Sequence, residues 1–141
     1  MIYKTSIEGI THQMLHGFFV NWANPPSPDA HLRILQGSFK FVLAVDEANN
    51  QVVGFINAIS DGVLSAYIPL LEVLPDYQKQ GIGKELVSRI MSELSDFYMV
   101  DLLCDKSLQP FYERLGMVRA DGMATRNFRF QSGSNAREER W

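Results

Sequence analysis

The chain has 141 residues, of which 46% are hydrophobic and 21% charged, as expected for one soluble globular domain. A formal net charge of −3 gives no reason to expect nucleic acid as a partner. With one cysteine, no cleavable apolar segment at the N-terminus and no run long enough to span a membrane, we expect a cytoplasmic protein.

The first half of the chain predicts two helices and an antiparallel set of strands. Apolar residues at three- and four-residue steps indicate an amphipathic helix over residues 7–20. After a proline cluster, Ser27 or Asp29 is placed to cap a second helix that runs to Leu35. Strands are expected at residues 2–5, 39–45, 52–59 and 63–74, with hairpin turns at 46–50 and 61–62.

The second half predicts strands that alternate with helices. An apolar stripe at helical spacing follows residue 81 and consists of Ile82, Leu86, Val87, Ile90, Met91 and Leu94. We expect a strand at 98–104, a helix at 108–115 ended by Gly116, and an edge strand at 123–130. Residues 1–130 then form one domain and 131–141 a disordered tail. Because the hairpins precede the crossovers, the fold class is α/β with a mixed, mostly antiparallel sheet that is not doubly wound.

The loop before the third predicted helix has the features of an anion site. Gln78, Gly81 and Gly83 stand at Q-x-x-G-x-G spacing between an apolar strand and an amphipathic helix. The first N–H groups of such a helix lack internal partners, so they and the helix dipole favour phosphate. A P-loop would need Gly at Gln78 and Ser or Thr at Glu85, and the Rossmann spacing would need Gly at Leu86.

Two motifs together resemble the GNAT superfamily of acetyl-CoA-dependent N-acetyltransferases. The first is Val73-Leu74-Pro75 followed by the glycine loop, which is similar to the family's V-x-P and Q/R-x-x-G-x-G/A. The second, residues 105–117, resembles N-x-x-A-x-x-F-Y-E-K-x-G-F, with Asp105, Leu108 and Met117 replacing Asn, Ala and Phe. The resemblance implies the GNAT fold, in which the cofactor lies between two splayed central parallel strands flanked by helices.

The same resemblance implies acetyl-CoA as cofactor and a set of residues that bind it. These are Leu71, Val73, Gln78, Lys79, Gln80, Gly81, Ile82, Gly83, Lys84, Asp105, Leu108, Phe111 and Tyr112. A main-chain N–H near Val73 is implied as the oxyanion donor. Lys79 and Lys84 place two positive charges near the expected phosphates. Alternatively, they belong to a solvated loop whose charge is partly neutralised by Asp76 and Glu85.

Acetyl transfer to an amine requires an acid for the departing thiolate. A thiol has a pKa of ~8.5 and a phenol of ~10, so a nearby tyrosine can donate with little mismatch. The family's tyrosine acid falls on Tyr112, which we take as the candidate. The alternative is that Phe111 and Tyr112 are packing aromatics.

The general base has two candidates, and a water chain is a third. Glu72 is a carboxylate among apolar residues, where desolvation would raise its pKa. In a regular strand it would point away from the face of Tyr67, the other candidate, unless a bulge changes the alternation.

Three other features have structural as well as functional interpretations. His12 and His16 have a metal-like spacing, but two ligands make no site and no metal is expected. Cys104 ends an apolar strand and is interpreted as a buried small hydrophobe. Trp22 could line an acceptor pocket or anchor packing.

The expected function is transfer of an acetyl group from acetyl-CoA to a primary amine, most simply a small molecule, by direct attack in a ternary complex. Protein lysines or N-termini are alternative acceptors. A GNAT-fold module that binds acyl-CoA without turnover is the alternative from another class. The expected edge strand makes either a monomer or a homodimer compatible with the sequence.

Overall fold

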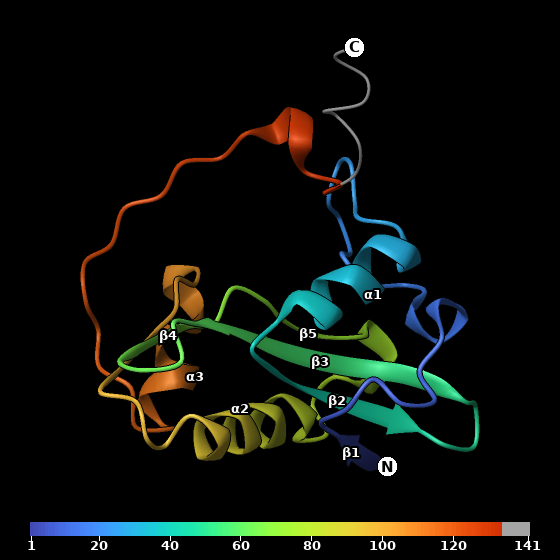
Figure 1. The fold of residues 1–141 in the computed structure, drawn as a ribbon, viewed down its shortest axis with the longest axis horizontal. Coiled ribbons are helices and arrows are strands. Elements are labelled where there is room, and N and C mark those ends of the chain that lie inside the picture. The colour runs from blue at the N-terminus through green and yellow to red at the C-terminus, as the bar shows by residue number, and fades with distance from the viewer. Residues whose placement is uncertain (134–141) are drawn as a thin grey trace.

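A computed structural model describes residues 1–133 as one mixed sheet with helices on both faces (Figure 1). The strands are β1 (Ile2–Lys4), β2 (Lys40–Asp46), β3 (Gln51–Ser60), β4 (Ser65–Tyr67), β5 (Leu71–Val73) and β6 (Met99–Asp101). The helices are α1 (Pro28–Gly37), α2 (Ile82–Glu93) and α3 (Gln109–Glu113). Single 3-10 turns occupy His12–Leu15, Pro75–Tyr77, Lys106–Leu108 and Phe128–Phe130.

The sheet is antiparallel through its first strands and becomes parallel at one edge. Its order is β1-β2-β3-β4-β6, and β5 also pairs with β3, beyond the end of β4. The β4–β6 pair is parallel, whereas the other pairs are antiparallel. The mixed, mostly antiparallel sheet that the sequence predicts is confirmed.

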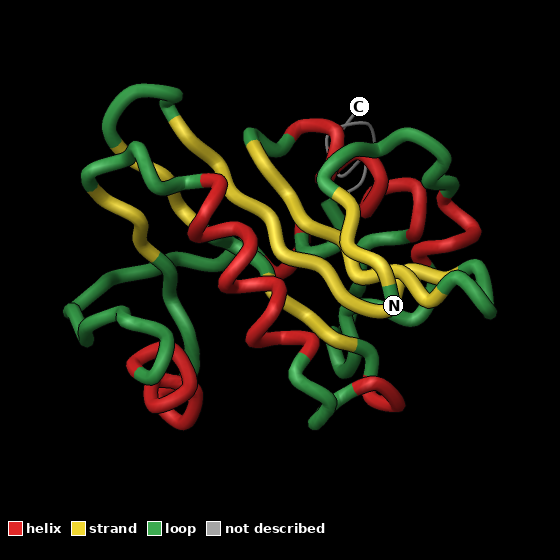
Figure 2. The backbone as a smooth tube through the Cα atoms, turned by 90° about the horizontal axis from the view of Figure 1, so that it is seen from below, coloured by secondary structure: helices red, strands yellow, loops and turns green. Residues whose placement is uncertain are grey.

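The core is built from apolar side chains on both faces of β2 and β3. Helix α2 crosses one face (Figure 2) and buries Leu86, Val87 and Ile90 against it, so the predicted stripe is confirmed. On the other face, α1 begins at Pro28 because the Ser27 hydroxyl accepts a hydrogen bond from the Ala30 N–H at 3.1 Å.

The predicted helix over residues 7–20 is wrong. Only the single 3-10 turn at His12–Leu15 forms there, because the chain turns through left-handed conformations at Gly17 (φ 93°), Phe19 (φ 62°) and Asn21 (φ 68°). The apolar residues that suggested a helix are nevertheless buried: Ile10, Met14, Leu15, Phe18 and Phe19. These residues are apolar because they are buried, and their spacing resembles that of a helix although no α-helix forms.

Three predicted strands also need correction. The strand expected at 63–74 is divided into β4 and β5, and the strand at 98–104 is reduced to β6. The edge strand expected at 123–130 is wrong: residues 118–127 form a long arc outside the sheet and a 3-10 turn follows (Figure 1). Most of the predicted tail, residues 134–141, lies outside the described residues. No helix within residues 1–133 is long and apolar enough to cross a bilayer.

Candidate active site between the diverging strands

A one-residue bulge separates β4 from β5 and changes which side chains share a face. Tyr67 pairs with Ile59 of β3 and Leu71 pairs with Ile56, so four steps on one strand oppose three on the other. Side chains alternate along a strand, so the extra residue places Tyr67 and Glu72 on the same face of the sheet. A regular strand would have placed them on opposite faces.

The parallel pair β4–β6 ends just where this bulge begins. Its last register pair is Tyr67 with Asp101, followed by one hydrogen bond of 2.9 Å from the Ile68 N–H to the Asp101 carbonyl. Beyond that point β5 pairs with β3 and not with the chain that follows β6. The two strands therefore diverge, and their outward main-chain groups face the space between them.

The hydrogen bonds between β3 and β5 show which main-chain groups of β5 point away from β3. The Leu74 N–H donates to the Val53 carbonyl at 2.8 Å, and the Leu70 carbonyl accepts from the Asn57 N–H at 3.3 Å. In an antiparallel ladder the intervening odd positions point the other way. The N–H groups of Leu71 and Val73 consequently point away from β3, toward the opening.

The loop from Lys79 to Lys84 presents main-chain donors that have no acceptor. No N–H between these residues makes a hydrogen bond to another described residue. Lys79 (φ 64°) and Gly81 (φ 84°) adopt left-handed conformations, which turn successive N–H groups toward one side. With the positive end of the twelve-residue helix α2 behind them, these donors form a site for an anion.

The side chains of this loop divide into supporting and exposed ones. The Gln78 amide donates to the Val73 carbonyl at 3.0 Å, which ties the loop to the end of β5. Lys79, Gln80 and Lys84 are exposed, whereas the Ile82 side chain is buried in the core. Glu85 pairs with Arg89 at 2.7 Å and forms no ion pair with Lys84 within residues 1–133. Two positive charges therefore remain beside the donors.

The second sequence motif meets this loop only in the tertiary structure. A Cβ added at Gly83 would lie 3.8 Å from the Phe111 ring and 3.9 Å from Val73, so the glycine is at the junction of α2, α3 and β5. The Phe111 and Tyr112 rings are 5.0 Å apart in an edge-on contact. Asp105 and Leu108 are exposed beside the 3-10 turn that precedes α3.

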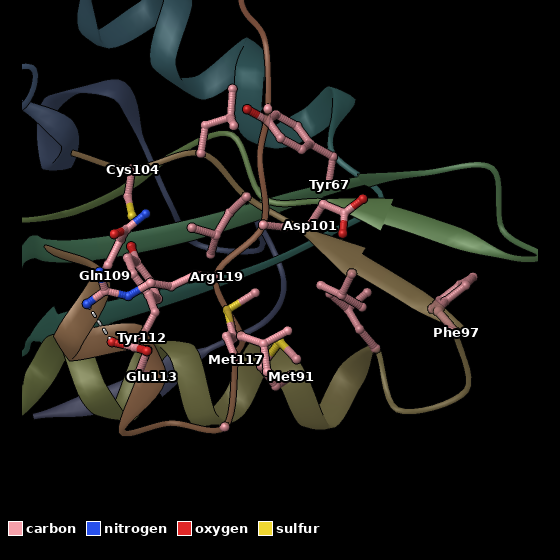
Figure 3. Close-up of a pocket in the computed structure, with 18 of the residues that line it drawn as sticks. Tyr67, Met91, Phe97, Asp101, Cys104, Gln109, Tyr112, Glu113, Met117 and Arg119 are labelled. Atoms are coloured by element: carbon pink, nitrogen blue, oxygen red, sulfur yellow. Dashed lines mark hydrogen bonds and ion pairs between the residues drawn. The ribbon is translucent and has the colours of Figure 1, made fainter. Parts of the chain in front are cut away.

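A cavity of about 900 Å³ adjoins the diverging strands (Figure 3). Cys104, Gln109 and Tyr112 lie together on one side of it, and Tyr67 and Asp101 lie on the adjoining strands. Glu72 is not among the lining residues. Of the catalytic candidates, Tyr67 and Tyr112 therefore share a cavity, while Glu72 lies outside it.

The Tyr112 phenol is buried, and only 9% of the residue is exposed. Burial, with a smaller contribution from Cys104, raises the pKa of Tyr112 to about 12. The hydroxyl therefore carries its proton throughout the neutral range. The pKa lies further above that of a thiol than the ordinary phenol value used in the sequence argument.

Glu72 has hydrogen-bond partners that the sequence did not indicate. Its Oε1 accepts from the Phe19 N–H at 2.8 Å, and its Oε2 accepts from the Val20 N–H at 3.3 Å. The carboxylate thus holds the turn in the N-terminal segment against β5. Trp22 lies on the same segment and packs against Phe19, with ring centroids 4.9 Å apart.

The remaining candidates make local contacts. His12 pairs with Asp29 at 3.4 Å, His16 contacts the Gln13 carbonyl at 2.8 Å, and Cys104 is half-buried. Within residues 1–133 no group of three or more His, Cys, Asp or Glu side chains is placed to hold a metal ion.

Two features of the cavity were missed by the sequence analysis. Asp101 lines it beside Tyr67, and Arg119 closes part of it by donating to Glu113 at 2.8 Å. Asp101 could have been found from the expected parallel pairing, because it stands in the strand that follows the helix. The Arg119–Glu113 pair depends on the path of the chain after Gly116 and had no sequence signal.

A fold with diverging parallel strands and a donor-rich loop at a helix N-terminus is that of an acyltransferase, and comparisons with known proteins agree. The model of the acetyltransferase (GNAT) domain matches residues 8–128. The chain therefore belongs to the GNAT family of acetyltransferases.

Curated relatives and solved structures support this assignment. The chain is 40% identical over 80 residues to the chloroplastic GCN5-related N-acetyltransferase 3 of Arabidopsis thaliana, an alignment that covers 55% of this chain and 34% of that protein. It is 31% identical over 103 residues to ycf52 of Gracilaria tenuistipitata var. liui, which is named as an uncharacterized N-acetyltransferase, covering 70% and 56%. The chain thus spans from about a third to somewhat over half of these relatives' length.

Among solved structures, a Deinococcus radiodurans R1 protein classed as an acetyltransferase is 49% identical, with a TM-score of 0.92, covering 96% of this chain and 94% of that one. A GNAT-family protein of Streptococcus pneumoniae is 28% identical, with a TM-score of 0.72, covering 89% and 97%. The overall similarity extends over nearly the whole described chain.

Proposed function

We propose that this chain transfers an acetyl group from acetyl-CoA to a primary amine of a small molecule by direct attack in a ternary complex. The observation that carries the proposal is the row of unpaired main-chain donors from Lys79 to Lys84 at the N-terminus of α2. Several main-chain donors that converge at a helix N-terminus, with no competing protein acceptor, fit a ligand with several anionic oxygens. The pyrophosphate of coenzyme A is that kind of ligand.

The residues present also fit the remainder of acetyl-CoA. The outward N–H groups of Leu71 and Val73 offer donors to an extended, amide-bearing chain and to a developing oxyanion. Phe111 provides an apolar wall beside Gly83, where no Cβ narrows the approach. Bound acetyl-CoA would supply the thioester whose carbonyl carbon the amine attacks and whose thiolate leaves.

The side chains of the cavity would perform the proton transfers. Tyr112 holds a proton on its hydroxyl at neutral pH and could donate it toward the departing sulfur. Tyr67 lines the cavity, where its hydroxyl would orient a water that carries the proton leaving the amine to solvent. Glu72 is less favoured as the base, since both of its oxygens accept main-chain hydrogen bonds elsewhere.

Asp101 supports an amine as the acceptor. An exposed carboxylate at the cavity attracts a protonated amine and raises its local concentration. The single cysteine agrees with a reducing compartment, and we propose the cytoplasm as the location.

The decisive experiment is a panel of small amines and lysine-bearing peptides incubated with acetyl-CoA, with thiol release as readout. We expect a rate above the acetyl-CoA background with at least one small amine. Acetyl-CoA binding without turnover on any acceptor would indicate the binding-module alternative. Turnover on peptides alone would shift the acceptor to protein lysines or N-termini.

A further inference from the structure

Cys104 is the single cysteine of the chain, and its thiol has no role in the proposed transfer. It stands just after β6, on the side of the opening opposite the outward N–H groups of Leu71 and Val73. Its side chain is half-buried and lines the cavity of about 900 Å³ (Figure 3). A thiol that is open to a cavity is available for chemistry, unlike one enclosed in the core.

The hydroxyl of Tyr112 is an independent indication of a ligand beside this thiol. Tyr112 is only 9% exposed, and its hydroxyl makes no hydrogen bond to another residue within 1–133. Figure 3 shows its ring rising from α3, with Cys104 and Gln109 beside the hydroxyl end. A buried hydroxyl without a protein partner indicates that a polar atom of a ligand takes the position in front of it.

If the proposed function is correct, that ligand atom is the sulfur of coenzyme A, and this step of the inference rests on it. The donors that would hold the pyrophosphate end beside Gly83, which Phe111 approaches from α3. The next residue of α3, Tyr112, turns toward Cys104 instead. Helix α3 therefore joins the phosphate end of the site to the end where the thiol group of the cofactor would lie.

We propose that Cys104 is a site of reversible modification, at which the protein forms a mixed disulfide with coenzyme A. The co-reactant is the disulfide of coenzyme A. The Cys104 thiolate attacks the sulfur of the half that the loop binds, so that a bond forms between Sγ and this sulfur while the original S–S bond breaks. The other half leaves as a thiolate and takes up a proton. One disulfide replaces another, so no further oxidant is required.

The anion site would make this reaction selective. Binding of the pyrophosphate at residues 79–84 raises the effective concentration of the attached disulfide near Cys104. Another disulfide of similar chemistry that lacks a pyrophosphate, such as oxidised glutathione, gains nothing from the loop. The attached coenzyme would occupy the position that acetyl-CoA needs and stop the transfer, and a thiol reductant would restore the free cysteine by exchange.

The test incubates the full chain with the disulfide of coenzyme A and follows the mass of the intact protein. We expect an adduct of one coenzyme A per chain, which dithiothreitol removes. Oxidised glutathione should react at least about tenfold more slowly, and an excess of acetyl-CoA should protect Cys104. Gly83→Val should lower the rate with the disulfide of coenzyme A to that with oxidised glutathione.

The control carries the thiol outside the site, in a Cys104→Ser chain with Ser88→Cys on the exposed face of α2. This thiol should react with both disulfides at similar rates. Equal rates for Cys104 as well would overturn the inference. So would the absence of an adduct in a protein that binds coenzyme A by calorimetry, a result that leaves the proposed function intact. A protein that does not bind coenzyme A would overturn both.

Discussion

The Oε1 of Glu72 accepts a hydrogen bond of 2.8 Å from the main-chain N–H of Phe19, 53 positions earlier in the chain. Phe19 has a left-handed backbone (φ 62°), a conformation that a bulky residue adopts only when its surroundings impose it. The carboxylate is therefore part of what holds the N-terminal segment over β5. This contact places an ionisable residue of the site strand in a structural role.

Replacing Glu72 should separate that role from catalysis. Glu72→Ala leaves two main-chain donors without partners, and we expect a loss of roughly 1–3 kcal/mol in the free energy of unfolding. Glu72→Gln keeps one acceptor and should lose less than half of that. Denaturant unfolding measures both. If Glu72→Gln instead keeps full stability but loses ~10²-fold or more in kcat, Glu72 acts as the general base.

Gly83→Val should abolish acetyl-CoA binding while the protein stays folded. The first added carbon has room, at 3.8 Å from Phe111, but the larger side chain would enter the space in front of the unpaired donors. We expect the affinity to fall by about 100-fold or more, as charge-assisted hydrogen bonds are lost. Calorimetry measures binding, and circular dichroism the fold. Ser88→Val, on the exposed face of the same helix, is the control and should bind normally.

Tyr112→Phe tests the proton donor. If the hydroxyl stabilises the departing thiolate, kcat and kcat/KM for acetyl-CoA should fall together by ~10²–10⁴-fold with nearly unchanged cofactor affinity. Weaker cofactor binding with a small change in kcat would instead indicate a packing role.

His31 should make the stability depend on pH. It is 1% exposed, neither ring nitrogen has a hydrogen-bond partner within residues 1–133, and Phe18, Phe19 and Phe55 surround it. Burial lowers the pKa of His31 from 6.5 to about 4. Between pH 6.5 and pH 4, His31 is therefore protonated in the unfolded chain but neutral in the folded one. The stability present above pH 6.5 is lost as the pH falls toward 4.

The free energy of unfolding should fall by an amount on the order of 3 kcal/mol between pH 6.5 and pH 4, and His31→Phe should remove most of this pH dependence. His12→Gln serves as the control, because the His12 side chain is 48% exposed and should leave the slope unchanged. Thermal unfolding at pH values from 7 to 4 measures both variants. Equal slopes in the unmodified protein and His31→Phe would show that other groups set the acid sensitivity.

Asp101→Asn tests the attraction of the amine. We expect KM for a cationic amine to rise by about 3- to 10-fold with a smaller change in kcat, since a charge near the entrance affects encounter more than chemistry. The effect should diminish at high salt. Asp96→Asn, an exposed acid outside the cavity lining, is the control. Equal KM values for Asp101→Asn and the unmodified chain would show that Asp101 does not attract the amine.

The amino-acid sequence by itself determined the parts of this protein that depend on local signals. Gly81 and Gly83, at fixed spacing before an apolar stripe, specified the loop and α2, because left-handed turns and helical periodicity are encoded within a few residues. The Ser27 cap and the β2–β3 hairpin were predictable for the same reason.

The tertiary structure decided the rest. The bulge that brings Tyr67 and Glu72 to one face exists because β3 pairs with two separate segments, which no window of the sequence shows. The partners of Glu72 and the pKa of Tyr112 depend on burial by distant residues. The path of residues 118–127 outside the sheet was also decided by the tertiary structure, because a strand forms only where another strand pairs with it and none does so here among the described residues.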